Sequence, residues 1–220
     1  MGKPSLPRVV PCVLLLAFTS YLMNCQAAPK DPTTPGDPTP TPPVQQNGAS
    51  VQGVLMWKGD LSETGTYSNE TTLTPANVNV SQFGRLGSFK ADGIIMGQPL
   101  YVSGVDMGSG GSHDLVIVTT EHDSVYAIDA DNPAAAPVWE RHYVDAANGI
   151  TTMPDNFGGR TTLGGEVGIT GTPYVDAKTG ILYFVTTLER NGAPEQWLRA
   201  IDIRTGQDFG PGSVQIPARV

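Results

Sequence analysis

The sequence predicts an all-β fold, and three observations lead to that prediction. Glycine and proline account for 26 and 19 of the 220 residues, a share typical of turn-rich β structures. Apolar residues do not recur at helical spacing in any window of about twelve residues. Short segments rich in β-branched and aromatic residues, each bounded by turn residues, recur along the chain instead.

The folded part is expected to span residues 50–220 and to contain eight strands, each short and bounded by glycine, proline or polar turn residues. The predicted strands lie at residues 100–102, 115–119, 124–128, 138–143, 174–175, 181–186, 197–201 and 213–216. One short helix is predicted at residues 74–79, where a threonine cap precedes a proline at the first helical position.

The charge balance limits the classes of partner. The chain has 13 Lys and Arg against 21 Asp and Glu, which gives a formal net charge of −8. Because nucleic-acid binding needs a basic surface, we expect no nucleic-acid partner. Charged residues make up only 15% of the chain, too few for a coiled coil, whereas the hydrophobic share of 39% is sufficient for a core.

Residues 1–28 have the pattern of a secretory signal peptide of a bacterial protein. Lys3 and Arg8 form a positive start, residues 9–23 form an apolar run, and the small residues Ala27 and Ala28 follow. The apolar run is too short to span a bilayer in the mature protein. The sequence therefore predicts a secreted or periplasmic location.

Two ways of processing this signal remain open. The chain is either cleaved after Ala27 or attached to lipid at Cys25, as in a lipoprotein, although Asn24 stands where a lipobox has Gly, Ala or Ser. Contact with a membrane is expected only through that anchor. Since Cys12 lies inside the apolar run, the mature chain can form no intrachain disulfide.

Residues 29–49 are predicted to be a disordered linker. Seven of the fifteen residues from 29 to 43 are proline, and most of the others are Thr or Asp. Such a run favours extended polyproline II, which at ~3.1 Å per residue would hold a domain about 45 Å from its anchor. The alternative is a proline-rich ligand for an aromatic groove of a partner.

The predicted strands repeat in one order. The matched segments are residues 97–102 with 171–176, 115–120 with 181–186, and 127–129 with 200–202. Each unit contains four strands, and tandem four-stranded units are typical of β-propeller blades. The interval between the units exceeds a bare blade, and the surplus is expected to form a loop at residues 148–168.

Residues 200–206 resemble the Ala-x-Asp-x-x-Thr-Gly segment of the pyrroloquinoline quinone (PQQ) repeat, which occurs in quinoprotein dehydrogenases and in non-catalytic envelope propellers. The first unit holds a looser copy without Thr-Gly. In this family a tryptophan that follows the motif often docks neighbouring blades. The repeat-motif residues are Ala127, Asp129, Trp139, Ala200, Asp202, Thr205 and Gly206.

The resemblance covers residues 54–216 approximately. This part of the chain is similar to secreted bacterial members of the family with no assigned activity. It implies an all-β propeller of four-stranded antiparallel blades, of which about two are present. Asp129 and Asp202 are expected to form turns, because an aspartate before a turn accepts backbone N–H bonds and Gly206 tolerates a positive φ. A ligand role for these two aspartates is the alternative.

An acidic cluster and a separate acid, Glu166, are candidates for chemistry. Glu121, His122 and Asp123, with His113 and Asp114 nearby, have the side chains of a metal site or an acid–base pair. Adjacent residues on a strand point to opposite faces, so the first three can converge only in a loop. We expect a polar turn between the second and third strands of the first unit.

Glu166 lies in a run of small residues that leads into the second unit. If that strand lines the central channel of a propeller, Glu166 and Thr170 would face a ligand there, with Arg160 reaching in from the insertion. The resemblance implies PQQ and calcium as the cofactors of such a site, with Glu166 as a metal ligand. The mature chain has no vicinal Cys pair, which many quinoprotein dehydrogenases use, and no catalytic residue can be assigned.

Two classes of function follow. The first is a non-catalytic secreted or envelope-tethered β-propeller that binds or scaffolds envelope proteins, extracellular proteins or glycans. The alternative is a PQQ-dependent quinoprotein oxidoreductase, or a fragment of one, with a calcium-assisted channel site; another propeller enzyme or an inactive remnant also remains open. A closed propeller needs about four blades, so we expect either a truncated member of a longer family or copies that assemble to close a ring.

Overall fold

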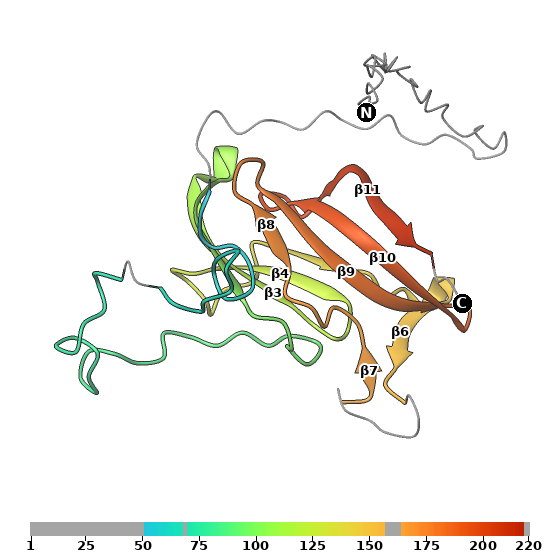
Figure 1. The fold of residues 1–220 in the computed structure, drawn as a ribbon, viewed down its shortest axis with the longest axis horizontal. Coiled ribbons are helices and arrows are strands. Elements are labelled where there is room, and N and C mark those ends of the chain that lie inside the picture. The colour runs from blue at the N-terminus through green and yellow to red at the C-terminus, as the bar shows by residue number, and fades with distance from the viewer. Residues whose placement is uncertain (1–50, 68–69, 157–163, 218–220) are drawn as a thin grey trace, which may run out of the picture. The chain divides into compact units, whose positions relative to one another are not determined.

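The computed structural model describes residues 51–67, 70–156 and 164–217, which form two antiparallel β-sheets (Figure 1). The predicted signal peptide with Cys25, the linker at residues 29–49, and Arg160 lie outside the described residues. The expectation of an all-β fold is confirmed, since only two short 3₁₀ helices accompany the strands in the described ranges. No helix in this part of the chain is long and apolar enough to cross a membrane.

The first sheet has the strand order β1-β2-β3-β4-β5, and all neighbours are antiparallel. Its last four strands form a meander, with the 3₁₀ helix η1 (Gly108–Gly110) in the first hairpin. Four of the predicted strands lie within it. The bounds are β1 Gln52–Val54, β2 Leu100–Asp106, β3 Ser112–Thr119, β4 Ser124–Asp129 and β5 Trp139–His142.

The second sheet contains a corresponding antiparallel meander, β8-β9-β10-β11, which includes the other four predicted strands. The 3₁₀ helix η2 (Ala146–Asn148) precedes β6, which pairs with the later half of β9, and β7 pairs with β6. The bounds are β6 Ile150–Pro154, β7 Glu166–Val167, β8 Tyr174–Asp176, β9 Ile181–Arg190, β10 Ala193–Asp202 and β11 Asp208–Ile216.

Two predictions about local structure are wrong. Residues 148–168 are not simply a loop, because β-branched residues in β6 pair with an extension of β9. Residues 74–79 form a turn and not a helix. The side chain of Asn77 accepts a hydrogen bond from Thr74 N and donates one to Thr72 O, and such local bonds compete with the helical backbone ladder.

The strand registers place the matched segments of the two units in corresponding rows. In the first sheet Leu100 lies opposite Ile117, and Ile117 lies opposite Ala127. In the second sheet the corresponding row is Tyr174, Tyr183 and Ala200. The first row is completely buried, whereas the second is at least partly exposed.

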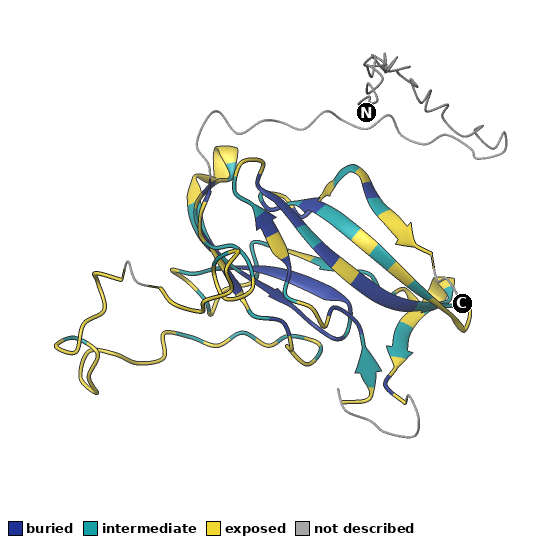
Figure 2. Ribbon diagram, viewed as in Figure 1, coloured by how far each residue is buried: buried dark blue, intermediate teal, exposed yellow. Residues whose placement is uncertain are grey.

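The main core lies between the two sheets (Figure 2). Because side chains alternate along a strand, each sheet turns one set of residues toward this core. The first sheet contributes the row of Leu100, Ile117 and Ala127, and the second contributes residues of the alternate set, among them Leu182, Phe184 and Ile201.

The outer faces of the two sheets differ. On the first sheet, Val118, Tyr126 and Ile128 form a second cluster that Phe89 and Ala91 cover. Phe89 meets Tyr126 edge to face, with ring centroids 5.0 Å apart. On the second sheet, three apolar side chains form an exposed row across neighbouring strands: Val185, Leu198 and Val214.

Candidate functional site

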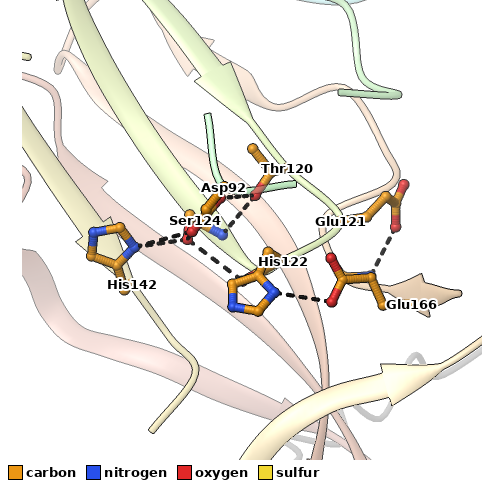
Figure 3. A network of polar contacts seen from close by, with 8 residues as sticks. Asp92, Thr120, Glu121, His122, Ser124, His142 and Glu166 are labelled. Carbon is orange, nitrogen blue, oxygen red and sulfur yellow. Dashed lines mark hydrogen bonds and ion pairs between the residues drawn. The ribbon is translucent and has the colours of Figure 1, made fainter. Parts of the chain in front are cut away.

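Four residues between β3 and β4 form the junction turn: Thr120, Glu121, His122 and Asp123. The prediction of a polar turn at this position is confirmed. Its burial is unusual, because Thr120, Glu121 and Asp123 have no exposed surface, and carboxylates are almost never completely buried unless they are paired. The turn lies at the centre of a polar network that joins several segments (Figure 3).

The junction turn is held between two segments that are distant in the sequence. On one side Glu121 N donates to Ile94 O at 2.9 Å, and on the other Ile169 N donates to Thr120 O at 3.1 Å. Glycines permit both approaches. A Cβ atom on Gly93 would lie 2.8 Å from His122 N, and one on Gly168 would lie 2.3 Å from Glu121 O.

Glu121 links the junction turn to the segment that follows β7. Its Oε2 accepts hydrogen bonds from Gly168 N at 2.8 Å and from Thr170 Oγ1 at 2.9 Å. Its Oε1 is buried and has no hydrogen-bond partner among the described residues. Thr170, expected to face a ligand, therefore binds a carboxylate of the protein.

His122 contacts Glu166, the other residue expected to face a ligand. Its Nδ1 lies 2.9 Å from Glu166 Oε2, and both side chains are partly exposed (Figure 3). Glu166 and the acidic cluster of the junction turn thus meet at one place. His113 is not part of it, since it lies at the opposite end of β3 with its Nδ1 3.0 Å from Asp129 Oδ2.

Asp123 connects the junction turn to the second sheet. Its Oδ1 accepts a hydrogen bond from Thr187 N in β9 at 3.1 Å, while its Oδ2 is buried without a partner in the described part of the chain. Burial raises the pKa of Asp123 to about 8, and the nearby negative charges of Glu121 and Glu166 add to this effect. Asp123 is therefore largely protonated at neutral pH.

Ser124, His142 and Asp92 form a polar group beside the junction turn. Ser124 Oγ donates to Asp92 Oδ2 at 2.6 Å and lies 2.8 Å from His142 Nδ1. Burial raises the pKa of Asp92, but hydrogen bonds from Ser124 and Thr120 outweigh it, so the pKa lies below its ordinary value. Asp92 Oδ2 also lies 3.5 Å from His142 Nδ1, and Glu140 Oε1 lies 3.6 Å from His142 Nε2. Because Ser124 is completely buried, its hydroxyl is not presented to a substrate as that of a nucleophile would be.

Sequence reasoning missed Asp92. It has no motif around it, and the only local signal is the Asp-Gly pair that it forms with Gly93, which indicates a turn. Its role depends on Thr120 and Ser124, to which its two carboxylate oxygens bind. No spacing rule connects those positions with residue 92.

The repeat-motif aspartates form turns, as expected. Asp129 Oδ1 accepts a hydrogen bond from Asp131 N, and Asp202 Oδ1 accepts one from Arg204 N, both at 2.9 Å. Gly206 has a φ of +66° and donates its N–H to Asp202 O. The hydroxyl of Thr205 accepts a hydrogen bond from Gln207 N.

Trp139 makes a second contact between the two sheets. From β5 its Nε1 donates to Ile203 O at 2.7 Å, and its ring lies against Gly206, where a Cβ atom would come within 2.7 Å of the indole. The motif turn of one unit therefore receives a tryptophan from the other. Ala127 lies opposite this tryptophan in the first sheet, and Ala200 lies in the corresponding row of the second.

The described residues around Glu166 are bonded to one another. No three His, Cys, Asp or Glu side chains among them are grouped so that they would hold a metal ion. Glu166 is instead engaged by His122, and Thr170 by Glu121. Comparisons with protein-family models, with curated proteins and with solved structures found no match.

Proposed function

We propose that this protein is a non-catalytic binding or scaffold module, a β-propeller of PQQ-like repeats that is secreted or tethered to the bacterial envelope. One observation carries the proposal: the acids of the junction turn are buried and bonded to neighbouring segments. Glu121 binds the backbone at Gly168, and Asp123 binds the backbone of β9. Side chains held in this way stabilise packing and are not presented to a substrate.

The packing of the two sheets supports the propeller architecture. The first sheet turns the row of Leu100, Ile117 and Ala127 to the core, whereas the second turns its alternate set, with Leu182 and Ile201, to the same core. The two faces that meet in the core are therefore not the corresponding faces of the two units. Such head-to-tail packing continues from unit to unit, as it does between consecutive propeller blades.

The outer face of the second sheet follows from the same arrangement. Its row of Tyr174, Tyr183 and Ala200 corresponds to the row that the first sheet buries. In a closed ring this face would be covered by a further unit, supplied by additional chain or by another copy. The exposed row of Val185, Leu198 and Val214 is the apolar surface that such a unit would bury.

A thermal melt of the full chain with and without PQQ plus Ca²⁺ tests the proposal. A ligand that binds only the native state raises the midpoint, by ~2.7 kcal/mol of stabilisation at a hundredfold excess over its Kd. We expect a cooperative transition whose midpoint is unchanged. An upward shift that is lost in Glu166→Gln would instead establish the alternative, a quinoprotein oxidoreductase.

A further inference from the structure

A groove on the first sheet lies apart from the junction turn. It consists of two adjoining hollows of about 450 Å³ and about 460 Å³, which share Gly53, Val54 and Tyr67. Volumes of this size are typical of small-molecule sites. The floor is formed by β1 and β2, where Val54 lies opposite Tyr101 and Gln52 lies opposite Ser103.

Two tyrosine rings line the groove. Tyr67 is 66% exposed and Tyr101 is 37% exposed. The hydroxyl of Tyr101 donates a hydrogen bond to Asp114, which holds the ring in place and raises the pKa of Tyr101 to about 12. The floor therefore presents a fixed aromatic surface, and Tyr67 adds a second that is largely open to solvent.

The charged groups at the groove are directed mainly to their own segments. Glu70 Oε1 accepts hydrogen bonds from Thr72 N and Leu73 N, and Asp60 accepts them from Ser62 N and from the hydroxyl of Thr64. Lys58 is the one cation among the lining residues of the two hollows. This composition suits an uncharged ligand better than an anion, which would favour several basic donors.

Polar groups at the rim complete the chemistry. Gln52 and Ser103 line the same hollow as the two tyrosines. The amide of Gln52 can donate and accept hydrogen bonds, and the hydroxyl of Ser103, which donates to Gln52 O at 3.3 Å, can accept one. A hexose unit has one apolar face of C–H groups and a rim of hydroxyls, so it matches aromatic rings with amide and hydroxyl groups around them.

We propose that this groove binds a neutral sugar unit of an oligosaccharide, stacked on Tyr67 and Tyr101. This inference rests on the proposed function, which it deepens by naming a site and a class of ligand for the binding module. Tyr67 supplies most of the accessible aromatic surface, and Gln52 and Ser103 contact the hydroxyls. The sugar lies over β1 and β2 and does not reach the buried acids of the junction turn.

Calorimetric titration of the full chain with cellohexaose, chitohexaose and maltohexaose tests the site. We expect saturable binding of at least one probe. Tyr67→Ala should weaken it about tenfold through loss of stacking, whereas Tyr67→Phe, which keeps the ring, should remain within about threefold of wild type. Tyr174→Ala is the matched control, because Tyr174 is 42% exposed but lies on the second sheet.

The outcomes are distinct. Binding that Tyr67→Ala weakens and Tyr174→Ala leaves unchanged, with both variants melting like wild type, supports the site. No saturable binding of any probe, or equal losses in the two variants, overturns it. Neither of these results alters the melt with PQQ and Ca²⁺, so failure of the sugar site and failure of the proposed function are separately recognisable.

Discussion

Two turns of this protein occupy corresponding places and have opposite surroundings. The junction turn connects β3 to β4, and Asn191 with Gly192 connects β9 to β10. Each contains a non-glycine residue with a positive φ, +52° at Asp123 and +51° at Asn191. Asp123 is completely buried, whereas Asn191 is exposed. Similar local backbone thus accompanies different chemistry, which is set by the segments packed on the turn.

The contacts of the two turns explain the difference. The junction turn binds the segment around Asp92 and Gly93 on one side and the segment from Gly168 to Thr170 on the other. The second turn makes a backbone hydrogen bond from Asn191 N to Gly149 O. We infer that the junction turn acts as a clamp between the sheets, whereas the second turn closes a hairpin and holds a single neighbouring segment through one backbone hydrogen bond.

The largest effect is expected from Gly168→Ala. The added Cβ would lie 2.3 Å from Glu121 O and 2.8 Å from Asp123 N, both backbone atoms that cannot move independently of the turn. Separation of the clamp should lower the free energy of unfolding by about 3 kcal/mol, a value typical of overpacking in a tight contact. Urea unfolding followed by circular dichroism measures the change.

Gly171→Ala is the matched control for this variant. A Cβ on Gly171 meets no atom within 4 Å, and its φ is not in the left-handed region. We expect its free energy of unfolding to stay within about 0.5 kcal/mol of wild type. Equal loss in the two variants would show that the segment as a whole, and not its contact with the junction turn, determines stability.

An effect that depends on pH is expected from Asp123→Asn. The folded chain holds the proton of Asp123 up to about pH 8, whereas the unfolded chain releases it near its ordinary pKa of 3.8. Wild-type stability should therefore fall as pH rises through this window, by a few kcal/mol in total. Asparagine keeps an acceptor for Thr187 N and tolerates the positive φ. The free energy of unfolding of the variant should therefore increase relative to that of wild type as pH rises.

Urea midpoints at pH 5, 7 and 9 measure this difference. Asp131→Asn serves as the control, because Asp131 is exposed. With the same acid-to-amide change at this position, stability should depend on pH as it does in wild type. An Asp123→Asn curve parallel to that of wild type would mean that Asp123 ionises normally in the folded protein, and the clamp would then contain an ordinary carboxylate.

Sequence reasoning located the strands because their signals are local. Residues 115–119 and 124–128 are β-branched or aromatic and end at polar turn residues, so β3 and β4 could be predicted from their own composition. β6 and β7 could not, because they lie in a segment whose glycine, threonine and asparagine content is typical of loops. The pairing of β6 depends on an extension of β9 beyond the predicted strand, and β7 pairs with β6.

The candidate site was predictable in part for the same reason. Glu121, Asp123 and Glu166 were identified as notable acids, and the position of the turn was correct. Their burial depends on residues that meet only in the folded chain, such as Gly93 and Gly168, whose missing side chains admit the turn. No local pattern distinguishes an acid that will be covered from one that remains in water.

The smallest effect is expected from Asn191→Asp, which places an aspartate in the exposed turn with the backbone conformation of Asp123. Aspartate tolerates this conformation as asparagine does, so the free energy of unfolding should change by less than about 0.5 kcal/mol. Because the new carboxyl is in water, the urea midpoints at pH 5, 7 and 9 should follow those of wild type. A loss of stability above pH 5 as large as that assigned to Asp123 would attribute the raised pKa to the turn conformation. A difference in stability between the variant and wild type that does not change with pH attributes the raised pKa to burial by the neighbouring segments, because burial is the property in which the two turns differ.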